Sequence, residues 1–73
     1  MIIFTNHALL KLKQRSLTKE KVIQTIENPD EIMLTYGDRN VILKKFGKLH
    51  LKVVFRKEGK DTVIITQHWI TKI

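Results

Sequence analysis

The chain has 73 residues, enough for one domain with a thin core, because a domain near this size buries only about 60% of the surface that its unfolded chain exposes. It contains 14 Lys and Arg against 7 Asp and Glu, and its net charge of +7 favours a polyanionic partner such as nucleic acid. The absence of cysteine excludes disulfides, zinc knuckles and thiol catalysis.

No apolar run is long enough to span a bilayer, and the N-terminal residues lack the basic leader and apolar stretch of a signal peptide. We therefore expect a cytoplasmic protein with no membrane partner. Lysines that only keep a small domain soluble are the alternative interpretation of the charge.

A short strand and a first helix are predicted at the N-terminus. Ile2–Phe4 is a candidate strand, and Thr5 and Asn6 have the short polar side chains that cap helix N-termini. A helix over residues 7–15 should follow, because its apolar residues recur at helical spacing.

A second helix is predicted to begin at Thr18, the expected N-cap. Leu17 and Val22 have the spacing of a hydrophobic staple around that cap. The Asn28-Pro29 pair ends the helix, because the residue before a proline is disfavoured in helical backbone. Both predicted helices are short, so they must pack on another element to be stable.

The rest of the sequence has the pattern of strands separated by short turns. The candidate strands are Glu31–Tyr36, Val41–Phe46, Leu49–Arg56 and Thr62–Ile70. A glycine lies in each segment between them, which is a turn signal, and tight turns join antiparallel strands. We therefore predict an α+β fold in a single domain over residues 1–73, with a short N-terminal strand, two helices and then a four-stranded antiparallel meander.

Alternation is clearest in the third of these candidate strands, because successive side chains of a strand point to opposite faces. The residues expected to face the helices are Leu49, Leu51, Val53 and Phe55. The residues expected on the opposite, open face are His50, Lys52, Val54 and Arg56.

The faces of the last candidate strand depend on the length of the loop before it. One set of residues is Val63, Ile65, Gln67 and Trp69, and the other is Ile64, Thr66, His68 and Ile70. A three-residue loop puts the second set beside the basic residues of the neighbouring strand. A two-residue loop reverses the assignment, because a register shift of one residue exchanges the faces.

Two groups of residues have the types that RNA cleavage requires. On the first helix His7, Lys11 and Arg15 are four residues apart and share a stripe, although like charges at this spacing repel each other. His7 is in the first turn, where the positive end of the helix dipole disfavours a positive charge. A histidine in a structural network is the alternative for His7, and a solvated face is the alternative for Lys11.

The second group is on the predicted sheet and consists of His50, Lys52, Arg56 and His68. Histidine moves protons near neutral pH, and lysine and arginine stabilise charge that develops on a phosphate. Cations that protect a sheet edge from aggregation are the alternative interpretation. Three histidines with few well-placed carboxylates do not indicate a metal site, so we predict no metal and no cofactor.

The segment from Phe4 to Thr18 resembles the start of a small prokaryotic family of unknown function, whose members have a His-Ala pair and two spaced arginines after a first strand. Residues 28–31 and 48–55 resemble the same family. His7 matches the histidine of the family, and Arg15 matches its second arginine. Lys11 stands where the first arginine is usual, and Ser16 stands where glycine is common.

The architecture of that family resembles RelE-type and barnase-like toxin ribonucleases. The resemblance implies a RelE-like fold and pairing with a small protein, which would be an acidic, antitoxin-like one. We predict a metal-independent RNA endonuclease with His7 and His68 for proton transfer. The residues expected to bind RNA phosphate are Lys11, Arg15, His50, Lys52 and Arg56.

Two other functions agree with the same residues. A nucleic-acid-binding domain without catalysis would use the same basic sheet, and a protein-interaction module would have that sheet covered by a partner. The sequence alone leaves these alternatives open, together with the oligomeric state and the RNA target.

Overall fold

The computed structural model describes residues 1–71, except for the side chains of residues 34–36. The elements in chain order are β1 (Ile2–Phe4), α1 (Asn6–Gln14), α2 (Lys19–Glu27), β2 (Glu31–Tyr36), β3 (Arg39–Phe46), β4 (Leu49–Glu58) and β5 (Asp61–Ile70). The fold is therefore α+β with two helices and a five-stranded mixed sheet. The predicted α+β class, the two helices and the antiparallel meander are confirmed, and the first strand joins the meander by pairing in parallel with β5.

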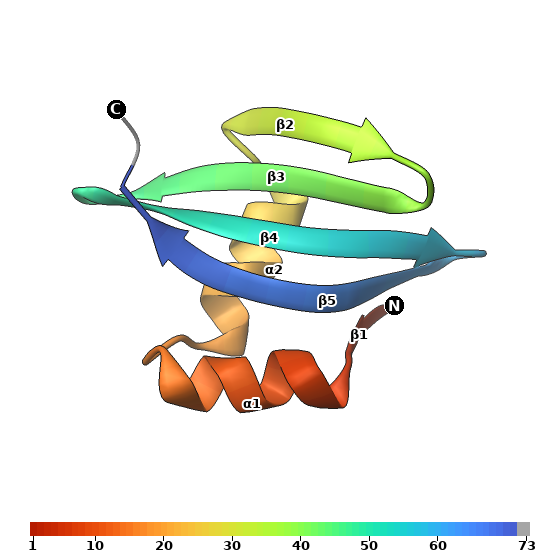
Figure 1. The fold of residues 1–73 in the computed structure, drawn as a ribbon, viewed down its shortest axis with the longest axis horizontal. Coiled ribbons are helices and arrows are strands. Elements are labelled where there is room, and N and C mark those ends of the chain that lie inside the picture. Colours follow the sequence, from red (N-terminus) through yellow and green to blue (C-terminus); the bar gives the residue numbers. More distant parts are fainter. Residues whose placement is uncertain (72–73) are drawn as a thin grey trace.

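The strands form one sheet in the order β1-β5-β4-β3-β2. β1 pairs with β5 in parallel, and the other neighbours are antiparallel. Because β1 pairs only with Thr62–Ile64, the later residues of β5 have no strand beside them on that side. Helix α1 runs along this free edge of β5, and α2 lies behind β3 and β4 (Figure 1). No helix of the described chain covers the other face, which we call the open face.

The two helices begin at the caps that the sequence predicted. Thr5 Oγ1 accepts a hydrogen bond from Ala8 N at 3.1 Å, and Thr18 Oγ1 accepts one from Lys21 N at 3.3 Å. Thr5 also binds the sheet, because its backbone N donates to Ile64 O at 3.2 Å. The N-terminal cap therefore also fixes the start of α1 against β5.

Helix α1 ends in a tight left-handed turn at Ser16, whose φ is 51°. The backbone N of Leu17 donates to Leu12 O at 3.0 Å, and both leucines are buried. A hydrogen bond between these positions, together with a contact between their apolar side chains, is the Schellman arrangement. Glycine is favoured at the position of Ser16 in this arrangement, because it has no Cβ.

Two of the three turns between strands of the meander are shorter than the sequence indicated, and the third, Gly47-Lys48, is as predicted. Only Gly59 and Lys60 separate β4 from β5, because Glu58 pairs with Asp61. Gly59 has a φ of 59°, and glycine at the first central position of a two-residue hairpin is typical of a type II′ turn. β3 therefore begins two residues earlier than predicted, β4 ends two residues later, and β5 begins one residue earlier.

A β-bulge in β5 changes which of its side chains face the helices. Before the bulge Val63 lies opposite Arg56, as a two-residue loop requires, and after it His68 lies opposite Lys52. The helix side of β5 carries Ile64, Gln67 and Trp69, and the open side carries Val63, Thr66, His68 and Ile70. Both alternations predicted for this strand are thus wrong over part of its length, because the extra residue, Ile65, exchanges the faces.

The core lies between the sheet and the two helices. Its buried members are Ala8, Leu12, Leu17, Val22, Ile42, Leu51, Val53 and Ile64. The prediction that Leu51 and Val53 face the helices is confirmed. Phe55 packs against the same cluster but is only half-buried.

Candidate functional site

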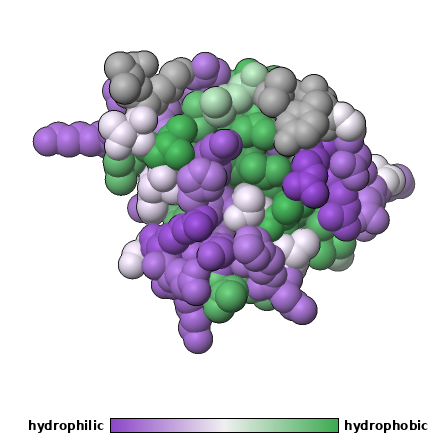
Figure 2. All heavy atoms as spheres, in the orientation of Figure 1, coloured by the Kyte–Doolittle hydropathy of each residue, from purple (hydrophilic) through white to green (hydrophobic). Residues whose placement is uncertain are grey.

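The open face combines an apolar floor with basic side chains. By strand register it is formed by Arg39, Val41, Leu43 and Lys45 of β3, His50, Lys52, Val54 and Arg56 of β4, and the open side of β5. Val41, Leu43 and Val63 are buried on this face although no helix packs over them. Figure 2 shows the same face, where hydrophobic atoms lie between hydrophilic ones.

His68 lies on the open face beside two cations. Lys52 is its direct partner across the β4–β5 ladder, and Arg15 reaches it from the end of α1. Partial burial lowers the pKa of His68, and the positive charges of Lys52 and Arg15 lower it further. The neutral imidazole is therefore favoured, which is the form that accepts a proton.

Arg15 is held beside His68 by the free edge of β5. Its Nη1 donates a hydrogen bond of 2.7 Å to the backbone oxygen of Gln67. The buried Gln67 side chain in turn donates from Nε2 to Ala8 O at 2.8 Å. These two hydrogen bonds join the α1 segment to β5, and Arg15, the last residue of the helix stripe, lies near His68 at the edge of the sheet.

His50 lies on the same face, opposite Ile70 in β5 and Lys45 in β3. Within the described chain its Nδ1 atom is buried and has no hydrogen-bond partner. The Asp30 carboxylate interacts electrostatically with His50. The pKa of Asp30 is lowered, chiefly by a 2.8 Å hydrogen bond from Lys45 N and also by the charges of Lys44 and His50.

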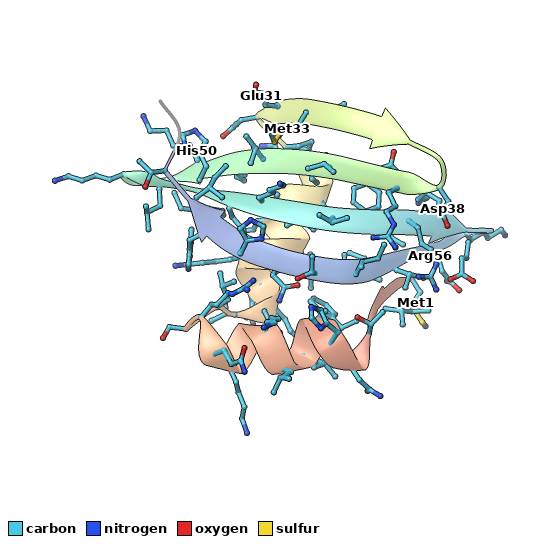
Figure 3. All side chains as sticks on the ribbon, viewed as in Figure 1. Met1, Glu31, Met33, Asp38, His50 and Arg56 are labelled. Carbon is cyan, nitrogen blue, oxygen red and sulfur yellow. The ribbon has the colours of Figure 1, made fainter. Side chains whose placement is uncertain are left out.

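Arg56 belongs to the other end of the open face. It is four residues from Lys52, or roughly 13 Å along an extended strand. Figure 3 labels His50 and Arg56 toward opposite ends of β4. The guanidinium of Arg56 pairs with Glu58 at 2.7 Å, and Arg39 lies directly across from Arg56 in β3.

The structure thus divides the predicted site residues into two groups. Arg15, His50, Lys52 and His68 gather at one end of the open face, and Arg56 lies apart from them. Lys11 donates to Gln14 Oε1 at 3.0 Å, so it is bound within its own helix. His7 is exposed in the first turn of α1 and makes no hydrogen bond with the described residues.

Sequence reasoning missed Arg39, which was assigned to a turn. Because Gly37 and Asp38 alone form the loop between β2 and β3, Arg39 is the first residue of β3 and lies on the open face. Gly37, at the first position of a two-residue loop, was the available signal. Among the described residues, no group of three His, Asp or Glu side chains is placed to hold a metal ion.

The model of a protein family described as a domain of unknown function, DUF4258, matches residues 4–66. The chain belongs to the DUF4258 family. No curated protein matches the sequence. Neither helix of the described chain has the length and apolar character needed to cross a membrane.

The fold of this DUF4258 chain is similar to that of the Brucella abortus ribonuclease toxin BrnT, known from a crystal structure. The two structures align with a TM-score of 0.72 over 97% of this chain and 96% of BrnT, at 16% sequence identity. At this identity the likeness shows a shared toxin-like fold. The roles predicted for the His7-Ala8 pair and the spaced cations of α1 stay predictions.

Proposed function

We propose that this DUF4258 protein is a toxin-type ribonuclease that cleaves RNA on the open face of its sheet. The observation that carries the proposal is the position of His68, a histidine with a lowered pKa between Lys52 and Arg15. RNA cleavage without a metal requires a proton acceptor, cations beside the phosphate and a proton donor, and His68 with Lys52 and Arg15 supplies the first two. The net charge of +7 and the fold shared with a ribonuclease toxin also support it.

In the proposed reaction His68 takes the proton from a ribose 2′-hydroxyl. The 2′-oxygen forms a bond to phosphorus, the bond from phosphorus to the 5′-oxygen breaks, and a protonated group donates a proton to that leaving oxygen. The products are a 2′,3′-cyclic phosphate and a 5′-hydroxyl. Lys52 and Arg15 stabilise the negative charge on the phosphoryl oxygens. His7 and His50 are the other two histidines of the chain that can supply the acid.

A small acidic protein is the partner that best fits the open face. Its carboxylates would pair with the basic side chains, and its apolar residues would cover Val41, Leu43 and Val63. Such a protein would keep RNA from the site, as an antitoxin does. An RNA substrate would place this activity in the cytoplasm.

The experiment measures RNA cleavage at neutral pH by the purified wild type and by two variants, Lys52→Ala and Lys13→Ala. Each variant removes one positive charge. Lys13 lies exposed on the outer side of α1 and is the matched control. We expect cleavage by the wild type and by Lys13→Ala, and a strong loss in Lys52→Ala. The His68→Ala variant should lose about 10²–10⁴-fold in rate and keep its RNA affinity.

RNA that binds but is not cut by the wild type would show a non-catalytic binder. Equal cleavage by His68→Ala and the wild type would remove His68 from the reaction. The unfolding transition of each variant is measured as well, and a cooperative transition shows that the variant is folded.

A further inference from the structure

We propose that His50 is the acid of this site, donating a proton to the leaving 5′-oxygen while His68 takes the 2′-proton. The inference rests on the proposed ribonuclease function and assigns its second proton carrier. Sequence analysis had paired His68 with His7 and had given His50 only a phosphate contact.

The register of the sheet brings the two histidines together. His68 lies opposite Lys52, and His50 is two residues from Lys52 on the same side of β4. The two histidines are therefore diagonal neighbours on one face, a relationship with a Cα separation of about 7–8 Å in antiparallel pairs. Side chains at such positions project from the same face of the sheet, so both rings can reach a group that is bound above Lys52.

Lys52 completes the arrangement, because it is next to both histidines on the open face. A cation at this position lies beside the phosphoryl group that His50 and His68 would flank. The proton balance is closed, since His68 gains one proton and His50 loses one while one P–O bond forms and another breaks. No oxidant, metal or further reactant enters the step.

The surroundings of the two rings differ in charge. His68 faces Lys52 from β4 and Arg15 from α1, and these cations together with partial burial lower its pKa and favour the base form. His50 faces Lys45 from β3, but the Asp30 carboxylate also interacts with it.

The two nitrogens of the His50 ring have different roles in this assignment. The Nδ1 atom is buried and, within the described residues, has no hydrogen-bond partner. His50 as a residue is half-buried, so we assign Nε2 as the nitrogen that donates to the leaving oxygen.

His7 is less well placed for this step. It is exposed on α1, beside the sheet edge, and does not belong to the open face. Its neighbour Ala8 accepts a hydrogen bond from Gln67 Nε2, so His7 is level with His68 along β5 but is separated from it by the edge of the sheet.

The test compares a substrate with a poor leaving group and one with a good leaving group. A good leaving group departs without a proton, so its cleavage needs the base but not the acid. One is a uridine-containing dinucleotide, whose 5′-oxygen must be protonated as it leaves. The other is uridine 3′-(4-nitrophenyl phosphate), whose nitrophenolate leaves without a proton. Wild type, His50→Ala, His50→Gln, His68→Ala, His7→Ala and Lys13→Ala are measured on both, each with its pH–rate profile.

We expect both His50 variants to lose about 10²–10⁴-fold on the dinucleotide and to stay within several-fold of wild type on the nitrophenyl ester. Their pH–rate profiles should lose the limb that falls at high pH. His68→Ala should lose activity on both substrates, since the base is needed in each case. Activity on the nitrophenyl ester also shows that a variant is folded.

Three results would overturn the assignment. The first is a His50 variant that cleaves the dinucleotide at the wild-type rate. The second is a His50 variant that unfolds cooperatively but loses the same factor in rate on both substrates. The third is a loss on the dinucleotide alone in His7→Ala and not in His50→Ala. In each case the wild type still cleaves RNA, so the ribonuclease proposal stands. A wild type without activity on either substrate would instead contradict the ribonuclease proposal itself.

Discussion

The guanidinium of Arg15 donates a 2.7 Å hydrogen bond to the backbone oxygen of Gln67, the residue that precedes His68. This contact joins the last residue of the α1 stripe to the strand that carries the candidate base. It places a fixed positive charge beside a histidine that already faces Lys52. The titration of His68 should therefore report on both cations.

We predict that Lys52→Ala and Arg15→Ala each raise the pKa of His68. Removing a positive neighbour makes the protonated ring less unfavourable, so the pKa moves back toward its ordinary value of about 6.5. Lys52→Ala should have the larger effect, because Lys52 contributes more than Arg15 to the lowered value. NMR titration of the His68 ring protons measures both shifts, and the rising limb of the pH–rate profile should move in the same direction.

Lys13→Ala is the control for these titrations. It removes the same charge from the outer side of α1, away from His68, and should leave the titration unchanged. An equal shift in Lys13→Ala would mean that His68 senses net charge and not these particular neighbours.

We also predict that Ser16→Gly stabilises the protein. Ser16 has a φ of 51°, and a residue with a Cβ pays roughly 1–2 kcal/mol in the left-handed region. Glycine removes that cost but loses about 0.5–1 kcal/mol of backbone entropy, so the net gain should lie between about 0 and 1.5 kcal/mol. Thermal unfolding should show a rise in melting temperature, at roughly 4–8 °C for each kcal/mol in a domain of this size.

Ser16→Ala separates this explanation from a loss of the serine hydroxyl. Alanine keeps the Cβ and the strain, so it should give no increase in melting temperature. A stabilisation by alanine as large as that by glycine would contradict the role of the left-handed backbone.

The sequence predicted the elements and caps of this fold because those signals are local. Thr5, Thr18 and the glycine turns act within a few residues of themselves, and the alternation around Leu51 follows from strand geometry alone. The bulge at Ile65 could not be predicted, because it is set by how β5 pairs with β4 while its edge meets α1. The buried position of Leu43 on the open face is likewise a product of packing by neighbouring strands.

The candidate site was predicted in part for the same reason. Residue types indicated phosphate chemistry, and the alternation placed His50 and Lys52 together on one face. The position of His68 beside Lys52 required the bulge, and the contact of Arg15 with Gln67 is between residues 52 positions apart. A single sequence contains no direct signal for such a contact.

Two core substitutions in β4 should differ in their effects. Leu51 is fully buried against the helices, so Leu51→Ala should lower the free energy of unfolding by about 2–5 kcal/mol. Phe55 is half-buried at the edge of the same cluster, so Phe55→Ala should cost less than the roughly 3–5 kcal/mol of a fully buried phenylalanine. Urea denaturation measures both. A Leu51→Ala cost below about 1 kcal/mol, the scale of surface substitutions, would show that this face of the sheet is not the core.

RNA binding should depend strongly on salt, because cations on the open face displace counterions from the phosphate backbone. For a single strand the slope of log K against log[salt] is about −0.7 for each phosphate that is neutralised. Lys52→Ala should therefore make the slope shallower by about 0.7, whereas Lys13→Ala, which removes the same charge from the outer side of α1, should leave it unchanged. Fluorescence anisotropy with a labelled single-stranded RNA, titrated at several salt concentrations, gives these slopes.

An affinity that stays constant as salt rises several-fold would show that the open face does not bind the backbone. An equal change of slope in both variants would mean that RNA is held by net charge alone, with no preference for the face that carries His50 and His68.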